Sequence, residues 1–507
     1  MATATISKCI PTFMEPKRRT TVRLHLKSAD PVKSAVQSKA DAFTSTLQAA
    51  PLPREFTQSP LKVFYIQSAH GLYASSGGYR ANMSLARALL SNGHTVKMLA
   101  FVYHHELESI PHTEDTPLHF LPNTPCRVYR FHYNDMSFVA LNVDDYRAVF
   151  KRHDVIIAES GYLEGIQTEF DEAFRVREEF IRREVRDHGP SHVIMNDPAS
   201  LKATLDGEEK LAVTRIFIVH DCENLPFGPF QPRCIWKELS DKPYQERPSW
   251  QRLRDVEGLW AVSDAVRNYF IKHGSLSPKS LPNHPLIYGD DVESLPYYNN
   301  YTAEYITAIN PGIHKGFPIV HALARRLPHQ KFLIVASWST TQHVLSQFRQ
   351  LPNVTIIPPQ KNIDTLFSKT RILLVPSLWL EAFGLVVVEA LLRGIPVISS
   401  DAGGLPEAHL YVPYIVPVNK FTGEREENPE LIDKWMVDYK VPEQGEDVLS
   451  GWEGAMRELE DQERYEEVRV LGRQKAVEYV KGIEWEGYEG WMRDCSEKNR
   501  EQVAQMA

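Results

Sequence analysis

Two glutamates, Glu381 and Glu389, flank a glycine in the stretch E-A-F-G-L-V-V-V-E, with seven residues between them. The stretch follows an apolar run that ends at Pro376–Ser377, and the residues from about 384 to 394 predict a helix. The first amides of a helix lack internal partners, and the helix dipole adds about half a positive charge there. Because glycine lets a ligand approach the backbone closely, the helix start predicts a phosphate or diphosphate site.

Glu389 lies about 7.5 Å along the helix axis from Gly384. A carboxylate can accept hydrogen bonds from the two hydroxyls of a ribose. One short segment could therefore contact a nucleotide diphosphate sugar in three places: Glu381 at the sugar, the amides of residues 384–386 at the diphosphate, and Glu389 at the ribose. Plainer interpretations also exist, because Glu389 could pair with Arg393 on the helix surface and Glu381 could be an N-terminal helix charge.

The elements that must position these residues alternate between strand and helix, which is typical of parallel α/β sheets. A Pro- and Asn-rich stretch after Gly274 predicts a connection between two such series. In open parallel sheets the ligand lies beyond the carboxyl ends of the strands. The expected strands are 61–68, 94–102, 154–160, 192–197, 215–221, 258–264, 304–310, 331–337, 354–359, 372–377 and 395–400; the expected helices include 79–93, 169–189, 317–327, 452–472 and 482–502.

Length and composition exclude several classes. The 507 residues, 43% hydrophobic and 24% charged, suit an ordinary soluble protein of more than one domain. The net charge of −8 argues against nucleic-acid binding. No apolar run reaches the ~18 residues of a membrane span, and the start lacks the apolar core of a secretory signal. The scattered cysteines argue against a disulfide scaffold or a zinc site and favour a reducing, cytoplasmic location.

The charge is unevenly distributed along the chain. Residues 1–60 hold nine Lys/Arg and four Asp/Glu, a balance of +5, so the remainder carries −8 − 5 = −13. This basic head could be a transit peptide, a patch that contacts an anionic membrane, or a poorly ordered extension, and the extension is the preferred interpretation.

Several motifs stand in the order found in one enzyme family. Around the glutamate pair stand V-P-S and G-I-P-V-I-S-S-D-A-G-G-L-P-E; Gly77–Gly78 precede the first expected helix, F-I-V-H-D contains His220, and H-K-G contains Lys315. This ordered set resembles retaining glycosyltransferase family 4 over about residues 60–410. The resemblance implies the GT-B fold: two doubly wound Rossmann-like domains that face a central cleft, with a C-terminal helix that crosses back to the N-terminal domain.

The resemblance also implies domains and site residues. The expected domains are a basic extension at 1–60, an acceptor domain at 61–285, a nucleotide-sugar domain at 286–480 and the crossing helix at 481–507. Glu381 and His220 would be catalytic, in the sense of positioning the sugar, and Lys315 would neutralise the diphosphate. The expected donor-binding residues are Gly77, Gly78, Asn310, Lys315, Phe383, Gly384, Leu385, Val386 and Glu389.

The sequence departs from the family pattern at two places, and two of the proposed site features also have simpler interpretations. Asn310 stands where the family usually has an Arg, so one diphosphate cation is missing, and Asn283–His284 replaces the usual N-G. His220 could simply be hydrogen-bonded at a strand end, and Gly77–Gly78 could be a plain turn. Aromatic residues of the N-terminal half suit either an acceptor or a core rim, and the core is preferred: Tyr73, Tyr79, Tyr103, Tyr129, Phe131 and Tyr133.

No two aspartates stand two positions apart, and no P-loop or HExxH motif occurs. This pattern predicts no metal and no cofactor, with helix amides and Lys315 in place of a divalent ion. The predicted function is a retaining hexosyltransferase that moves a sugar from a nucleotide diphosphate sugar, UDP favoured over GDP, to an acceptor hydroxyl of a glycan, lipid or small aglycone. The alternatives are a GT-B glycoside phosphorylase or nucleotide-sugar epimerase, and a non-catalytic binding module.

Overall fold

The computed structural model describes residues 59–506, apart from Ser75, residues 208–210 and residues 232–241, and it leaves out the side chains of His153 and of residues from 498 onward. Residues 59–507 form one compact unit. Nearly all of the predicted basic head at 1–60 thus lies outside the described residues. No helix in the described ranges is both long and apolar enough to cross a membrane.

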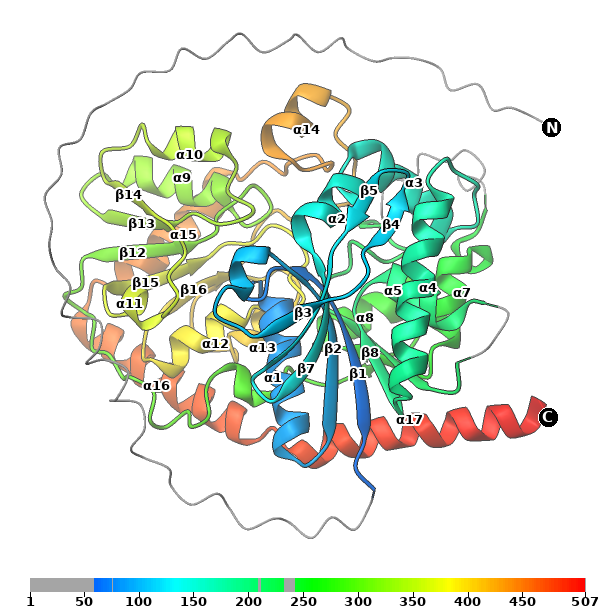
Figure 1. The fold of residues 1–507 in the computed structure, drawn as a ribbon. Coiled ribbons are helices and arrows are strands. Elements are labelled where there is room, and N and C mark those ends of the chain that lie inside the picture. Colours follow the sequence, from blue (N-terminus) through cyan, green and yellow to red (C-terminus); the bar gives the residue numbers. More distant parts are fainter. Residues whose placement is uncertain (1–58, 75, 208–210, 232–241, 507) are drawn as a thin grey trace, which may run out of the picture. The chain divides into compact units, whose positions relative to one another are not determined.

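Within the described residues, nine strands form one sheet in the order β11-β10-β9-β8-β1-β2-β7-β6-β3 (Figure 1). We call this sheet with its helices the N-terminal lobe. Its strands are parallel except at the β7-β6-β3 edge. The strands are β1 Lys62–His70, β2 Thr95–Val102, β3 His112–Glu114, β6 Val128–Tyr133, β7 Met136–Asn142, β8 His192–Met195, β9 Thr214–Val219, β10 Gly258–Ala261 and β11 Lys279–Ser280; β4 Leu118–Leu121 pairs separately with β5 Thr124–Cys126.

The helices of the N-terminal lobe connect and cover these strands. They are α1 Gly77–Ser91, α2 Val143–Phe150, α3 His153–Leu163, α4 Asp171–His188, α5 Pro198–Leu205, α7 Pro248–Asp255 and α8 Asp264–Tyr269. Shorter helical turns are η2 His104–Leu107, η3 Tyr244–Glu246, the π-turn η4 Phe270–Gly274 and η5 Pro285–Ile287.

The C-terminal lobe is built on the second sheet, whose six described strands are all parallel in the order β14-β13-β12-β15-β16-β17. The strands are β12 Tyr305–Ile309, β13 Lys331–Val335, β14 Val354–Ile357, β15 Thr370–Val375, β16 Val397–Ser400 and β17 Ile415–Val416. The helices are α9 Phe317–Arg326, α10 Gln342–Phe348, α11 Asp364–Phe367, α12 Leu385–Leu392, α13 Leu405–Ala408, α14 Pro429–Trp435, α15 Glu446–Glu458 and α16 Gln462–Lys481.

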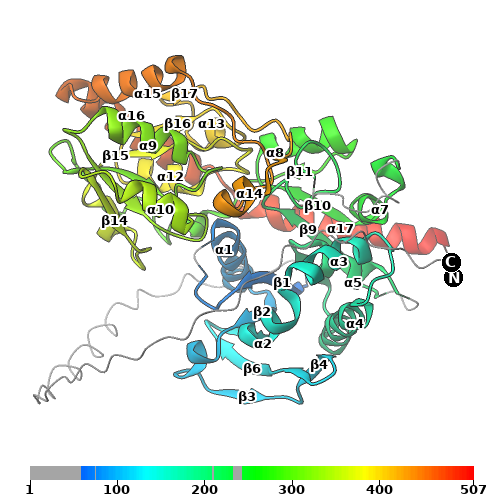
Figure 2. The ribbon, with the colours of Figure 1, turned by 90° about the horizontal axis from the view of Figure 1, so that it is seen from above.

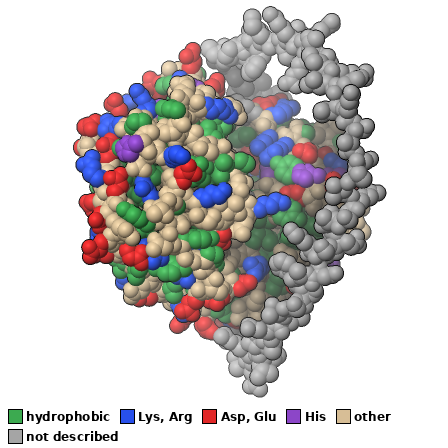
Figure 3. Space-filling view, turned by 90° about the vertical axis from the view of Figure 1, so that its left-hand side faces the viewer, with side chains coloured by type: hydrophobic (Ala, Val, Ile, Leu, Met, Phe, Trp, Pro, Cys, Tyr) green, Lys and Arg blue, Asp and Glu red, His purple; other side chains and the backbone are tan. Residues whose placement is uncertain are grey.

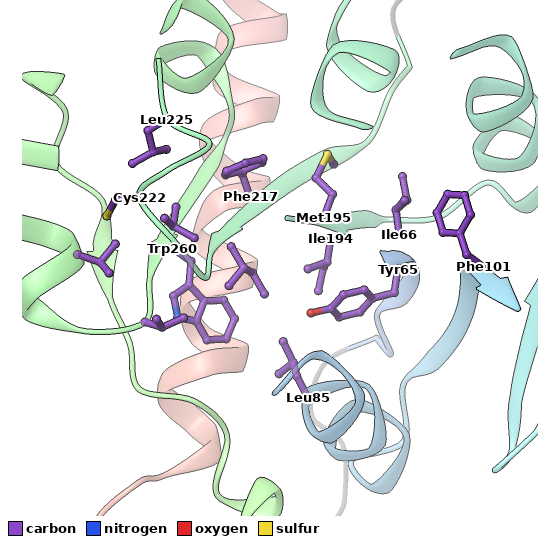
Figure 4. Packing of buried hydrophobic residues seen from close by; sticks show 14 of the residues in the cluster. Tyr65, Ile66, Leu85, Phe101, Ile194, Met195, Phe217, Cys222, Leu225 and Trp260 are labelled. Atoms are coloured by element: carbon purple, nitrogen blue, oxygen red, sulfur yellow. The ribbon is translucent and has the colours of Figure 1, made fainter. Parts of the chain in front are cut away.

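The central strands are almost continuously apolar because helices cover both faces of each sheet. Residues 63–66 of β1 and all of β8 are buried. Figure 4 shows Tyr65 of β1 and Ile194 of β8 on the side of Leu85 of α1, with Ile66 and Met195 on the opposite side of the strands. This packing fixes the carboxyl ends of the strands, and therefore the loops that follow them.

The last helix, α17 Trp485–Met506, packs on the N-terminal lobe, as the fold prediction expected. Met492 is fully buried and its carbonyl lies 3.0 Å from Nε2 of His192 in β8. Trp491 packs edge-on against Trp260 of β10, with ring centroids 5.8 Å apart. The chain therefore returns to complete the core of the lobe in which it began (Figure 1).

Two expected elements are wrong. The predicted strand at 154–160 is the helix α3, in which Val155 and Ala158 are buried while Ile156 is 51% exposed. Buried residues three positions apart are typical of one face of a helix. A run of only four apolar residues is too short to distinguish this period from that of a strand. The predicted helix at 452–472 is interrupted at residues 459–461, where Asp461 accepts a hydrogen bond from the Arg464 amide and begins α16.

The strand order reverses at one place in each sheet. In the N-terminal lobe the reversal lies between β1 and β8, and in the C-terminal lobe it lies between β12 and β15. Ligands of open α/β sheets bind at such reversals, beyond the carboxyl ends of the strands. The loops after β1, β8, β12 and β15 are therefore the positions at which a site is expected.

Candidate functional site

One cleft of about 1430 Å³ is lined by the loops at both strand reversals. The N-terminal lobe contributes residues after β1, β8 and β9, and the C-terminal lobe contributes residues after β12, β13 and β15. Seen from above, α1 lies at the side of the N-terminal lobe that faces the C-terminal lobe (Figure 2). Figure 3 shows a recessed part of the surface in which basic, acidic and histidine side chains gather. Every residue predicted for the site lines this cleft.

Lys315 and Glu381 meet at the reversal of the C-terminal sheet. Nζ of Lys315, in the turn after β12, donates to Oε1 of Glu381, in the loop after β15. Ser377 donates to the same oxygen at 2.5 Å. Burial opposes ionisation of Glu381, but Lys315 and the two hydrogen bonds outweigh it, so the pKa of this carboxyl lies below its usual value. The cleft therefore holds a fixed carboxylate beside a fixed ammonium.

Helix α12 begins in the cleft at Gly384, as predicted. Gly384 has φ +107°, a conformation that favours glycine, and a Cβ here would lie 2.6 Å from Cδ2 of Leu405. Phe383, which precedes it, is buried against the stacked ring of Tyr479. The first amides of α12 lack partners within the helix, and Gly384, Leu385 and Val386 line the cleft.

A second helix begins on the opposite wall. The side chain of Ser76 caps α1 by accepting from the Tyr79 amide at 3.3 Å. A Cβ at Gly77 would lie 3.4 Å from Cδ1 of Leu385, the first residue of α12. Two helix N-termini thus approach each other across the cleft, and both dipoles favour an anion between them.

Glu389 pairs with Arg80, a residue that the sequence analysis did not single out. Arg80 of α1 donates from Nη2 to Oε1 of Glu389 and to the carbonyl of Ile287 at 3.4 Å. The alternative of a side-chain pair between Glu389 and Arg393 is wrong, because Arg393 pairs with Asp364 at 2.5 Å. The side chain of Glu389 is only 5% exposed and that of Arg80 is 40% exposed. Arg80 therefore brings a second cation to the donor side of the cleft.

His220, after β9, belongs to a buried hydrogen-bond network. Its Nε2 lies 2.7 Å from Oδ1 of Asn82, which also accepts from the Tyr65 hydroxyl at 2.9 Å. A carbonyl oxygen can only accept, so Nε2 carries the proton and Nδ1 is left as an acceptor. Burial lowers the pKa of His220 to about 4, which keeps the ring neutral near pH 7. Gly78 lies over this ring, where a Cβ would be 3.2 Å from Cγ.

Asn310 directly follows β12 and has φ +54°, which asparagine tolerates better than most residues. Its Oδ1 accepts from the Ser339 amide at 3.0 Å and from Thr340 Oγ1 at 3.1 Å. Among the described residues its Nδ2 donates no hydrogen bond. Asn310 thus fixes the neighbouring loop and keeps an amide N–H for the cleft, without adding charge.

A further carboxylate joins the lobes. Glu407 of α13 accepts hydrogen bonds from the amides of Asp264 at 2.9 Å and Ala265 at 2.8 Å, the first residues of α8.

The aromatic residues of the N-terminal lobe divide between core and cleft. Tyr129 and Phe131 are buried in the core, whereas Tyr73, which is 59% exposed, and Tyr133 line the cleft.

The two facing sheets and the cleft at their strand reversals define a GT-B fold. The structure resembles the catalytic domain of starch synthase IV from Arabidopsis thaliana bound to ADP and acarbose, with a TM-score of 0.56 and 14% identity, over 87% of this chain and 100% of that one. It also resembles sucrose-phosphate synthase from Thermosynechococcus elongatus, with a TM-score of 0.55 and 16% identity, over 88% of this chain and 100% of that one.

The sequence comparisons support a glycosyltransferase family. Residues 312–410, which include Lys315 and both glutamates, match the family model described as glycosyl transferases group 1. A D-inositol 3-phosphate glycosyltransferase from Mycobacterium tuberculosis is 49% identical over 57 residues, which are 11% of this chain and 12% of that protein. The chain therefore aligns with only about an eighth of that curated relative, and so short a match indicates no substrate.

Proposed function

We propose that the protein is a retaining glycosyltransferase that moves a hexose from a nucleotide diphosphate sugar to an acceptor hydroxyl without a metal ion. The observation that carries the proposal is the meeting of the α12 start, Lys315, Glu381 and Glu389 in one cleft. A UDP-sugar is favoured over a GDP-sugar. An E. coli protein of the same fold, described as trehalose-6-phosphate bound with UDP-2-fluoro glucose, supports UDP, with a TM-score of 0.54 and 12% identity over 86% of this chain and 99% of that one.

The diphosphate would lie between the two helix N-termini. Amides of Gly384, Leu385 and Val386 would donate to its oxygens, and Lys315 would leave Glu381 to neutralise the phosphate next to the sugar. Charge-assisted hydrogen bonds of this kind can offset a diphosphate charge that other enzymes balance with a metal. The Nδ2 group of Asn310 would add a neutral donor.

Arg80 would exchange partners when the donor binds. In the structure its guanidinium is held by Glu389. A diphosphate placed at the α12 start would offer a stronger, doubly charged acceptor, because guanidinium groups bind phosphate in a bidentate manner. Release from Arg80 would free Glu389 to accept hydrogen bonds from the two ribose hydroxyls. The cation that is missing at position 310 would thus be supplied from the other lobe.

The sugar would be positioned by His220 and Glu381. Nδ1 of His220 would accept a hydrogen bond from a sugar hydroxyl, and the Glu381 carboxylate would accept from another. In front-face transfer the acceptor oxygen forms its bond to C1 on the face from which the phosphate oxygen leaves. The C1–O electron pair goes to the phosphate, which takes the proton of the acceptor hydroxyl. Closure of the lobes would exclude water, which would otherwise hydrolyse the donor.

The acceptor would enter over Tyr73 and Tyr133, whose rings pack edge-on and line the cleft, because aromatic faces suit a glycan, a lipid or a small aglycone. A membrane that carries the acceptor could be contacted by the basic residues at 17–19. We also propose a cytoplasmic location, since Cys126 and Cys222 are buried thiols outside any disulfide. Unchanged liposome binding after deletion of residues 1–58 would contradict the membrane contact.

The test is a thermal-shift panel of UDP, GDP, ADP and their sugars, because a ligand that binds only the native state raises its stability. We expect the largest shift with a UDP-sugar, followed by slow release of free sugar when no acceptor is present. The anomeric configuration of the product, read by NMR, should match that of the donor. No shift with any nucleotide would contradict the proposal, and release of a sugar phosphate from a glycoside and phosphate would indicate a phosphorylase.

A further inference from the structure

Two histidines and a glutamate meet on the N-terminal lobe, outside the residues assigned to the cleft. His104 lies in η2, and His112 and Glu114 lie on β3. One side-chain ligand atom from each lies within 4.8 Å of the other two. His112 and Glu114 share a face of their strand because side chains alternate along it. We propose that these three residues form a binding site for a borderline divalent cation, of which Zn²⁺ is the best fit.

The hydrogen bonds of His112 leave the ring ready for a metal. Its Nδ1 lies 2.9 Å from the carbonyl of Ile110, which can only accept. Nδ1 therefore carries the proton, and Nε2 presents its lone pair. A backbone carbonyl that holds the other ring nitrogen is the usual outer partner of a metal-binding histidine, because it fixes both the tautomer and the ring orientation.

His104 and Glu114 complete the ligand set. Nδ1 of His104 lies 3.2 Å from the hydroxyl of buried Tyr129. The ring of Tyr129 also packs edge-on against the ring of His112, with centroids 5.5 Å apart. Within the described part of the chain, Glu114 forms no salt bridge, so its carboxylate is available. Two imidazoles and one carboxylate suit Zn²⁺ and leave a position for water, whereas Mg²⁺ prefers oxygen ligands alone.

Small rotations of the side chains would bring the ligands to bonding distance. A tetrahedral ion with bonds of about 2.1 Å holds its ligand atoms about 3.4 Å apart. The side chains of His104 and Glu114 are exposed and that of His112 is half-buried, so they can close the remaining gap and a solvated ion can reach them.

The site would be coupled to the loop that follows β1. A bound ion would tie η2 to β3, and η2 contains Glu106. Oε2 of Glu106 accepts from the amides of Leu72 and Tyr103, each at 2.9 Å, and Oε1 accepts from Tyr73 at 3.4 Å. Leu72 and Tyr73 line the cleft. Metal binding would therefore make the acceptor side of the cleft more rigid.

The experiment is a titration of the full-length, tag-free protein with Zn²⁺ in competition with a chromophoric chelator. We expect one equivalent to bind, at least a tenfold loss of affinity in His112→Ala and in His104→Ala, and no change in His105→Ala, an exposed neighbour outside the cluster. A 100-fold excess of Mg²⁺ should not compete. Equal affinity in all four proteins, or no binding by the parent, would overturn the site.

Hydrogen exchange tests the coupling without any activity measurement. Zn²⁺ should slow exchange at the amides of Leu72, Tyr73 and Tyr103 by about threefold or more in the parent protein. The same ion should leave these amides unchanged in His112→Ala. Zinc binding with unaltered exchange at all three amides would overturn the coupling to the cleft.

Discussion

Arg80 and Glu389 form an ion pair that joins the two lobes, although 309 positions separate them in the chain. The carboxylate is almost completely buried and the guanidinium is partly exposed. Coulombic attraction by Glu389 is the main reason that the pKa of Arg80 is raised above its ordinary value, so this cation stays charged in the cleft. In the proposed donor complex Glu389 would accept hydrogen bonds from the ribose hydroxyls, and donor binding would therefore break this pair.

Replacement of Arg80 tests this exchange. Arg80→Ala should lower donor affinity by about tenfold or more, because a charge-assisted hydrogen bond to phosphate is worth about 1.5–3 kcal/mol. It should also lower the free energy of unfolding by about 1–3 kcal/mol, since Glu389 is left buried without a partner. Calorimetric titration and denaturant unfolding measure the two effects.

Arg87→Ala is the matched control. Arg87 is also in α1 and pairs with Asp290, in the segment between η5 and β12, but both side chains are exposed, by 47% and 78%. Exposed pairs contribute little, so neither quantity should change by more than about 0.5 kcal/mol. Equal effects of the two substitutions would contradict a specific role for Arg80.

Lys315→Met should reduce kcat by about 10²–10³-fold, the usual loss when one donor to a developing negative charge is removed. The pKa of Glu381 should rise in this variant, because burial would no longer be opposed by the ammonium. Initial rates at saturating donor measure the first effect. Lys331→Met, which removes a surface pair with Glu304 at 2.5 Å, should leave kcat unchanged.

The neutral state of His220 predicts a dependence of stability on pH. Its pKa is about 4 in the folded protein against 6.5 when exposed, so between these values the unfolded chain binds more protons. Stability should therefore fall as the pH decreases from 6.5 towards 4. His220→Gln should lose about 1–2 kcal/mol less than the parent between pH 6.5 and 5, as measured by denaturant unfolding at each pH. Parallel curves would show that the ring has the same pKa in the folded and unfolded states, which would contradict its burial as a neutral group.

Gly384→Ala should weaken donor binding and destabilise the fold, because its Cβ would meet Leu405 and its φ of +107° suits only glycine. Thermal unfolding with and without UDP measures both effects. Gly454 lies within α15 and a Cβ there would meet nothing within 4 Å. Gly454→Ala should therefore stabilise the protein by up to about 1 kcal/mol and leave nucleotide binding intact.

Much of the site could be predicted from sequence because it lies on local patterns. The apolar strand, the glycine and the apolar helix around residues 372–394 fix where α12 begins, whereas Lys315 was expected only from the family resemblance. Arg80 could not be found in this way. Its partner comes from the other lobe. The sequence does not show whether a charged side chain on a predicted helix faces another lobe or solvent.

The fold was less predictable where strands are antiparallel. The hairpin of β6 and β7 was missed, although Asn134 and Asp135 form its turn with φ values of +48° and +60°. Such residues between apolar runs are typical of a tight hairpin. The error at 154–160 has the related cause that a short apolar run fits both a strand and a helix. Contacts with residues distant in the sequence decide whether such a run forms a strand or a helix.

The packing of α17 has a consequence for the order in which the chain can fold during synthesis. Met492, Tyr488 and Cys495 complete a core whose other members lie on β8, β9 and β10. These three residues are synthesised only after the whole C-terminal lobe has left the ribosome. The N-terminal lobe must therefore wait with an uncovered apolar face, and a nascent chain that stops before residue 485 should require chaperones to stay unaggregated.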